Sequence, residues 1–390
     1  MRLIMSSHSI CPSALRLIRF RDKKVIVLKT NSSQTFLLKD LSETSVVQRL
    51  KHISLSAVPS WLGPRVATAS RFQHSMAVGR LSLLVSGGNN HDRLLLTATA
   101  ALHDVGDGPF PHISDQTMKE KLGFTHEGAV RFAFEHSPIE DNRILGKYGL
   151  NLNEICIVLE GQHAISPLFY GFPDLDNADN IYRFIATVPR QPLGEASYVP
   201  SEVASSMSLD LDKQNIPYDL KRRWTADFEK VYSYVWNDKC NMICWTMLGR
   251  ALRMLKNELN PSFFRLTNRE AYKFMKLKLP YWADGLSRGK YKIFVDKKFV
   301  ELRGDALRLM HPSSLAQVEK EMCDETGLED WMLGLTIDQP LLREKPDYWR
   351  VYLVLYKDSE TAKTLVNDML LSSDPFMEGN QNKKGESNFV

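Results

Sequence analysis

One short stretch, residues 102–112, limits how this chain can fold more than any other part of it. An apolar, alanine-rich run at 94–101 comes just before it and predicts a buried helix. His103 and Asp104 stand side by side at the expected end of that helix, and the glycines and proline of 106–109 start a loop. Neighbouring imidazole and carboxylate groups can bind one divalent cation. The pair alone is also compatible with an ordinary hydrogen bond at a helix end.

The composition fits a globular protein with a substantial core. The chain has 390 residues, of which 43% are hydrophobic and 25% charged. A formal charge of +4 is too small to indicate binding along nucleic acid. The five cysteines form no CxxC pair and are typical of reduced thiols, which favours a cytoplasmic protein. No apolar run reaches the roughly 18 residues of a membrane span, and no secretory signal is evident.

Hydrophobic periodicity predicts a mainly α-helical fold with β structure near both ends. Short strand-like runs at 23–28 and 35–38 predict a small N-terminal β element over residues 1–40. Helical spacing dominates 41–275, apart from a proline- and serine-rich stretch at 186–218 that predicts a loop.

The remainder of the chain changes character after residue 275. Strand-like runs at 291–295 and 348–356 and a helix at 359–371 predict an α+β domain over 276–378. The polar end, 379–390, has the composition of a disordered tail.

Two further motifs, one on each side of His103 and Asp104, also contain residues that can bind a metal. His74 lies upstream in the sequence RFQHS, and Asp176 lies downstream in DLDNADN. The resulting order, H…HD…D, resembles the HD-domain metal-dependent phosphohydrolases. RFQHS and HDVGDGPFPH are most similar to the deoxynucleoside triphosphate triphosphohydrolase branch, in which RFEHS, HDIGHGPFSH and DxDxxDY are typical. The resemblance covers roughly residues 41–270 and implies a helical HD core.

The resemblance implies a metal centre and names its ligands. These would be His74, His103, Asp104 and Asp176. Mixed imidazole and carboxylate ligands suit Mn, Fe or Zn, whereas oxygen ligands alone suit Mg. We therefore expect a divalent metal cofactor that activates water and neutralises phosphate oxygens.

The same resemblance assigns roles to residues around the metal. His112 and His126 are candidate proton donors, because imidazole titrates near neutral pH, and Asp115 would orient His126. The substrate-binding candidates are Arg71 and Lys239, which would contact phosphate oxygens, and Asn180.

Three departures from the family pattern bear on activity. Asp107 replaces a histidine in the segment 103–112, here called the HD loop. A carboxylate that faces a phosphate repels it unless the carboxylate is protonated or bound to a metal. Asp107 is thus predicted as a catalytic residue, either a second-metal ligand or an altered acid–base group; an impaired site and a simple loop cap are the alternatives. Leu55 and Asn180 stand where relatives have a sugar-contacting Gln and Tyr, so sugar selection is not implied.

The predicted function is metal-dependent hydrolysis of (deoxy)nucleoside triphosphates to nucleoside and triphosphate. The alternatives are an altered HD protein that acts as a nucleotide sensor or scaffold, and an HD nuclease or phosphodiesterase. The family is usually oligomeric, so we expect a homo-oligomer with a nucleotide as its partner. If dNTPs are destroyed, family resemblance also suggests a role in antiviral defence.

Overall fold

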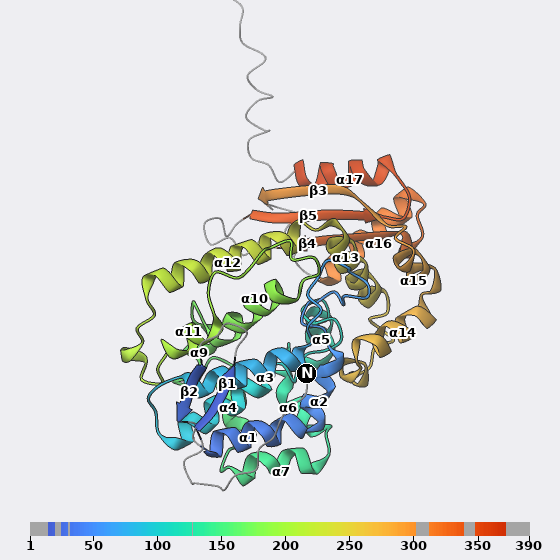
Figure 1. The fold of residues 1–390 in the computed structure, drawn as a ribbon. Helices are drawn as coiled ribbons and strands as arrows, with labels where there is room; N and C mark the ends of the chain where they lie inside the picture. Colours follow the sequence, from blue (N-terminus) through green and yellow to red (C-terminus); the bar gives the residue numbers. More distant parts are fainter. Residues whose placement is uncertain are drawn as a thin grey trace, which may run out of the picture.

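A computed structural model describes residues 15–19, 25–29, 32–126, 128–301, 312–338 and 348–371. The described chain is mainly helical, with a small N-terminal hairpin and a three-stranded sheet near the C-terminus, which confirms the predicted fold class (Figure 1). None of its helices is long and apolar enough to cross a membrane. The predicted tail at 379–390 lies outside the described residues.

The N-terminal β element differs from its prediction in one strand. β1 (Leu15–Arg19) pairs antiparallel with β2 (Val25–Lys29), which overlaps the strand expected at 23–28. The second expected strand, 35–38, is instead part of α1 (Ser32–Glu43). Leu37, Leu38 and Leu41 are all buried, a spacing that fits one face of a helix. The alternation over four residues was too short to distinguish the two.

The first core is formed by helices from the N-terminal two thirds of the chain. The central helix, α4 (Asn90–Leu102), is capped by Asn89 and Asp92, and residues 94–102 within it are all buried. It packs on α1 and α3. The elements of this part are α2 (Ser45–Arg49), α3 (Arg71–Leu81), α4 (Asn90–Leu102), α5 (Asp115–Leu122), α6 (Ala129–Glu135), α7 (Ile139–Lys147), α8 (Leu152–Leu159), α9 (Pro167–Tyr170) and α10 (Leu175–Thr187).

The stretch 186–218, predicted as a loop, contains one short helix. α11 (Pro200–Ser205) begins at a proline, whose fixed φ suits the first turn of a helix, and a 3₁₀ turn spans Leu211–Lys213. The helices predicted after it are present as α12 (Tyr218–Asn237), α13 (Lys239–Met254) and α14 (Asn268–Lys278).

A second core joins the HD loop to the C-terminal part. Phe110 and Ile113 pack in one cluster with Met247 and Leu248 of α13. The same cluster includes Trp282 from α15 (Pro280–Ser287), whose indole nitrogen donates to the carbonyl of Met247 at 2.9 Å. The loop that carries the candidate site is thus packed against helices far from it in sequence.

The C-terminal sheet consists of β3 (Lys292–Glu301), β4 (Leu333–Asp338) and β5 (Tyr348–Leu355). Their order in the sheet is β3-β5-β4, with antiparallel pairing throughout. α13 packs against β4, while α16 packs against both β4 and α17 (Figure 1). Of these elements β3 (Lys292–Glu301), β5 (Tyr348–Leu355) and α17 (Glu360–Leu371) match predicted segments, whereas α16 (Pro312–Thr326) and β4 (Leu333–Asp338) were not predicted. The predicted domain limits at 40 and 275 fall inside α1 and α14, and the division into domains stays a prediction.

Candidate metal centre

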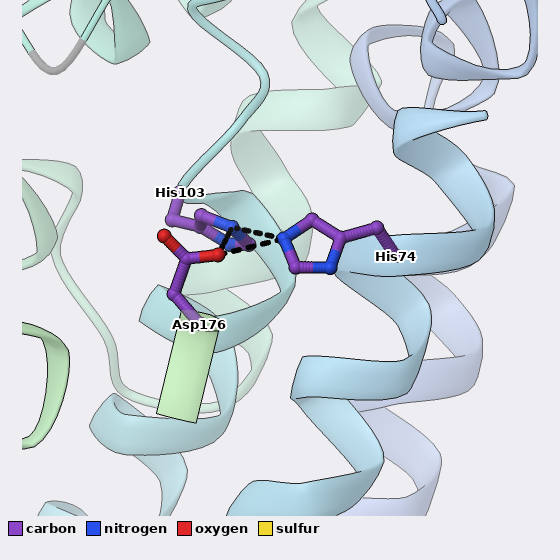
Figure 2. A group of neighbouring side chains, drawn as sticks. All are labelled: His74, His103 and Asp176. Carbon is purple, nitrogen blue, oxygen red and sulfur yellow. Dashed lines mark hydrogen bonds and ion pairs between the residues drawn. The ribbon is translucent and has the colours of Figure 1, made fainter. Parts of the chain in front are cut away.

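Three helix ends bring the candidate metal ligands together. Ser70 and Gln73 form a capping box that starts α3, and this places His74 in the first turn, fully buried. His103 caps the C-terminal end of α4. Asp174 caps α10, and Asp176 follows in its first turn. Figure 2 shows that the side chains of His74, His103 and Asp176 point toward one another from these elements.

The distances within this group suit a single cation. Nε2 of His74 lies 2.8 Å from Oδ1 of Asp176 and 3.2 Å from Nε2 of His103. Nε2 of His103 lies 3.6 Å from the same Asp176 oxygen. One ligand atom from each residue falls within 4.8 Å of the others. Two imidazoles and a carboxylate are ligands that Mn, Fe or Zn accept.

Hydrogen bonds behind the imidazoles fix their orientation. Nδ1 of His74 bonds Oδ2 of Asp179 at 2.9 Å, and Nδ1 of His103 bonds the carbonyl oxygen of Ala100 at 2.9 Å. In each ring this leaves Nε2 directed at the shared centre. Partners of this kind set the tautomer and raise the basicity of metal-bound histidines. Asp179 is therefore a supporting residue of the centre.

The charges around the centre favour a cation. Burial alone would lower the pKa of His74, but hydrogen bonds to Asp176 and Asp179 raise it to about 10. Burial would likewise raise the pKa of Asp176, but the two histidines hold it well below the ordinary value. Surroundings that stabilise an extra proton on an imidazole also suit a metal ion in place of that proton.

Asp104 contacts the centre and an arginine at once. Its Oδ1 lies 3.4 Å from Nε2 of His103, and its Oδ2 lies 3.7 Å from Nε2 of His74. Nη1 of Arg71 donates to Oδ1 at 3.0 Å. Although burial would raise the pKa of Asp104, Arg71 and the histidines lower it to about 2. Asp104 is thus an ionised carboxylate at the edge of the group.

Arg71 is surrounded by protein groups. Besides Asp104, it places Nε 3.1 Å from Oδ2 of Asp107 and Nη2 3.1 Å from Nε2 of His112. Only 5% of Arg71 is exposed, and Asp107 is fully buried. Burial raises the pKa of Asp107 even though Arg71 opposes this. Arg71 therefore joins the metal group, Asp107 and His112 into one network.

The comparisons with known proteins match the segment that carries three of these residues. The sequence profile of the HD domain matches residues 71–163, a segment that contains His74, His103 and Asp104. The chain contains an HD domain. The predicted resemblance to HD phosphohydrolases is thereby confirmed.

The relatives of this HD domain are distant and longer than the matched segment. Human deoxynucleoside triphosphate triphosphohydrolase SAMHD1 is 31% identical over 34% of this chain and 23% of its own length. The Gallus gallus protein of the same name is 29% identical over 32% of this chain and 23% of its own. An uncharacterized Bacillus subtilis protein, YdhJ, is 30% identical over 30% of this chain and 34% of its own. The chain thus spans about a quarter to a third of these relatives.

Two solved structures share the fold. A phosphohydrolase from Bacteroides thetaiotaomicron superposes with a TM-score of 0.59 at 15% identity, covering 88% of this chain and all of that one. A hypothetical protein from Aquifex aeolicus gives a TM-score of 0.57 at 14% identity, covering 82% and 92%. At these identities the likeness concerns the fold alone, and it extends well beyond the HD domain.

A second polar group lies beside the HD metal centre. Oδ2 of Asp115 is 2.9 Å from Nδ1 of His126 and 3.4 Å from Nδ1 of His112. The side chain of His112 is 49% exposed, in contrast to the buried His74, so solvent and ligand can reach it. Its backbone has a φ of +64°, an uncommon value for a residue other than glycine. The predicted proton donors are thus together, oriented by Asp115.

The other two substrate-binding candidates, Asn180 and Lys239, have fewer contacts with the metal centre. Asn180 is half-buried on α10, one turn after Asp176. Lys239 is exposed in the first turn of α13, and no hydrogen bond or ion pair given for the described residues joins it to the metal group. Tyr232 of α12, which sequence reasoning missed, lies near Asp176: burial, together with the charge of Asp176, raises its pKa to about 12. No sequence pattern singled it out.

Proposed function

We propose that this protein is a metal-dependent phosphohydrolase that acts on nucleotides. The observation that carries the proposal is the His74–His103–Asp176 group, with two buried imidazoles and a half-buried carboxylate, beside the more accessible His112–Asp115–His126 group. The first group, with Asp104, would hold Mn, Fe, Zn or Mg. Such an ion polarises a phosphate oxygen and lowers the pKa of bound water. Asn180 and Lys239 stay candidates for substrate contact.

The second group would manage the proton. Hydrolysis needs a proton on the leaving oxygen, and His112 is the accessible imidazole next to the centre. Asp115 lies next to Nδ1 of both His112 and His126, and Nε2 of His112 faces Nη2 of Arg71 at 3.1 Å. His112 and His126 are both candidate proton donors, and Nε2 of His112 can carry the proton only when its contact with Arg71 opens.

Arg71 and Asp107 have a different role in this proposal from the one that the sequence predicted. The terminal and ε nitrogens of Arg71 already face Asp104, Asp107 and His112. We therefore propose that Arg71 positions the metal ligand Asp104 and the proton donor His112. Asp107 in turn would position Arg71. Oδ2 of Asp107 lies 3.1 Å from Nε of Arg71, and we take this ion pair rather than a phosphate as the contact that its carboxylate makes.

The preferred substrates would be (deoxy)nucleoside triphosphates, cleaved by water at the α-phosphorus to give nucleoside and triphosphate. The names of the human and chicken relatives support this choice. Leu55 is buried and Asn180 carries no ring, so we expect weak selection of the sugar.

A substrate panel with Mn or Mg tests the proposed function. We expect dNTPs or NTPs to yield nucleoside and inorganic triphosphate, detected by chromatography. Release of pyrophosphate and monophosphate would place the cleavage elsewhere. Cleavage of cyclic nucleotides or single-stranded DNA would favour the phosphodiesterase or nuclease alternative. Binding without turnover would favour a nucleotide sensor, the alternative to which the enclosed Arg71–Asp107 pair lends support.

The Asp107→Asn variant tests the positioning role. We expect kcat to fall by roughly 10–100-fold, the usual effect of losing a supporting partner, with KM and metal content little changed. The reason is that Arg71 loses one of two carboxylates that fix its guanidinium. Steady-state kinetics with elemental analysis measure both quantities.

Two companion variants make this test specific. Asp141→Asn removes another buried carboxylate, one that bonds the backbone nitrogen of Ser45 at 3.0 Å, and should leave kcat unchanged. Asp107→His introduces the residue of the relatives. Loss of metal from Asp107→Asn would instead identify Asp107 as a ligand, and a gain of activity in Asp107→His would identify it as a repulsive acid.

A further inference from the structure

A separate small pocket lies on the other side of the HD loop. Its volume is about 180 Å³. One wall is Val105 and Gly106 of the loop, and the others come from α2, from α6 and its connection to α7, and from the 3₁₀ helix Pro261–Arg265. The polar side chains in its lining include Arg49, Arg265 and His136. None of these residues belongs to the metal centre or to the His112 group.

The charge of this pocket is positive. No Asp or Glu occurs among the described residues that line it, whereas two arginines do. Burial, together with the nearby Arg265, lowers the pKa of Arg49 to about 10, although Asp107 and Glu270 oppose this. Glu270 is itself engaged, because its Oε2 accepts from the backbone nitrogen and hydroxyl of Thr267, both at 2.8 Å. Two guanidiniums thus share a space with little compensating charge.

Hydrogen-bond donors remain available in the pocket. Arg265 donates Nη2 to the carbonyl of His136 at 2.6 Å, and its guanidinium makes no other hydrogen bond within the described residues. His136 bonds the carbonyl of Phe132 through Nδ1 at 2.9 Å, which leaves its Nε2. Arg49 directs its terminal nitrogens to the carbonyls of Leu266 and Val105 at 3.3 and 3.2 Å. A bound acceptor would find donors from two sides.

We propose that this pocket binds a small phosphate-type anion between Arg49 and Arg265. Planar guanidinium groups match the oxygens of phosphate. Pockets for drug-sized ligands measure roughly 300–1,000 Å³, so the smaller volume favours phosphate or pyrophosphate over a whole nucleotide. The anion would offset the repulsion between the two arginines.

Occupancy of the pocket would brace the HD loop. Arg49 donates to the carbonyls of Val105 and Asp107, the residues on both sides of Gly106. Gly106 has no room for a side chain, since a Cβ there would meet the carbonyl oxygen of His126 at 2.2 Å. An anion that fixes Arg49 therefore fixes the backbone between Asp104 and Asp107. This binding does not depend on the proposed hydrolysis.

Calorimetric titration of the full chain with inorganic phosphate, at constant ionic strength, tests the proposal. We expect Arg265→Gln to bind phosphate at least about tenfold more weakly, because one charged fork is lost. Arg288→Gln, which removes an exposed arginine paired with Asp284 on α15, is the matched control and should bind as the wild type does. His103→Ala/Asp104→Ala should also keep its affinity, because the pocket is separate from the metal centre.

Each opposite result would overturn the proposal. Absence of phosphate binding by the wild type would do so, as would equal affinity in Arg265→Gln. Loss of binding in His103→Ala/Asp104→Ala alone would place the phosphate at the metal. A nucleoside monophosphate that binds where phosphate does not would show that the site selects a nucleotide instead. Since Arg265 is exposed, its variant should fold, and phosphate should slow amide exchange at Val105 and Asp107 in the wild type but not in this variant.

Discussion

The double variant His103→Ala/Asp104→Ala should lose its bound metal and, with it, at least about a thousandfold of any hydrolytic activity. His103 contributes one imidazole to the group, and Asp104 lies 3.4 Å from it with an ionised carboxylate. Removing both leaves His74 and Asp176, which is one imidazole and one carboxylate. Too few ligands then remain to hold a divalent ion or to activate its water. Elemental analysis of the purified protein gives the metal content per chain.

The control for this variant lies on the same helix. His91 is partly exposed on α4 and bonds Oε1 of Glu154 at 2.8 Å, away from the centre. His91→Ala should keep both metal and activity. Added Mn or Zn should raise the thermal unfolding temperature of the wild type and of His91→Ala, because a ligand that binds only the folded state stabilises it. If the double variant retains its metal, or is stabilised equally by added metal, the ligand assignment is wrong.

Sequence reasoning was most successful where a pattern was long. The α4 segment has many consecutive buried positions and a clear stop in the Gly-Asp-Gly-Pro sequence, so its end and the place of His103 and Asp104 were predictable. The segment 35–38 is short, and its apolar residues fit a strand as well as a helix. β4 has few apolar residues and contains Gly334 and Asp338, so its sequence does not indicate a strand. Its place in the sheet depends on pairing with β5. That pairing is a tertiary property.

For the site, the sequence indicated residue types but not their partners. The spacing of His74, His103 and Asp176 with the family motifs was enough to group them, and the structure places their ligand atoms together. Nothing in the sequence says that Arg71 lies between Asp104 and Asp107. The same holds for the contact of Asp179 with His74. Such contacts depend on how α3, α4 and α10 cross, which residue spacing along the chain does not encode.

The second large effect concerns a buried ion group far from the HD centre. Glu319 of α16 is fully buried. Its Oε2 accepts from Nη1 of Arg250 and Nε of Arg253, both at 2.9 Å, and its Oε1 accepts from the backbone nitrogen of Leu335 at 2.8 Å. One carboxylate thus links α13, α16 and β4. Glu319 is the carboxylate that pairs with Arg253 among the described residues, and it shares Arg250 with Asp330.

We expect Glu319→Gln to lower the free energy of unfolding by about 3–5 kcal/mol, because removing one partner leaves buried charges without compensation. Urea denaturation of the full chain measures this. The control is Glu258→Gln, whose carboxylate pairs with Lys278 at 2.5 Å where both side chains are about half exposed. That change should cost no more than about 1 kcal/mol. Equal effects of the two variants would contradict a structural role for the buried group.

The pH dependence of Glu319→Gln provides a further test. Burial would raise the pKa of Glu319, but Arg253 and Arg250 outweigh it and hold the pKa below its ordinary value of 4.5. A carboxylate with a lowered pKa in the folded state contributes its full stability above the unfolded pKa and loses it as the pH falls through the folded pKa. The stability difference between wild type and Glu319→Gln should therefore be constant from pH 7 to about 5 and shrink below about 4.5.

Since α13 shares a core with Phe110 of the HD loop, activity should fall in parallel with unfolding in this variant. A loss of activity that precedes unfolding would instead show direct coupling between the C-terminal sheet and the metal centre.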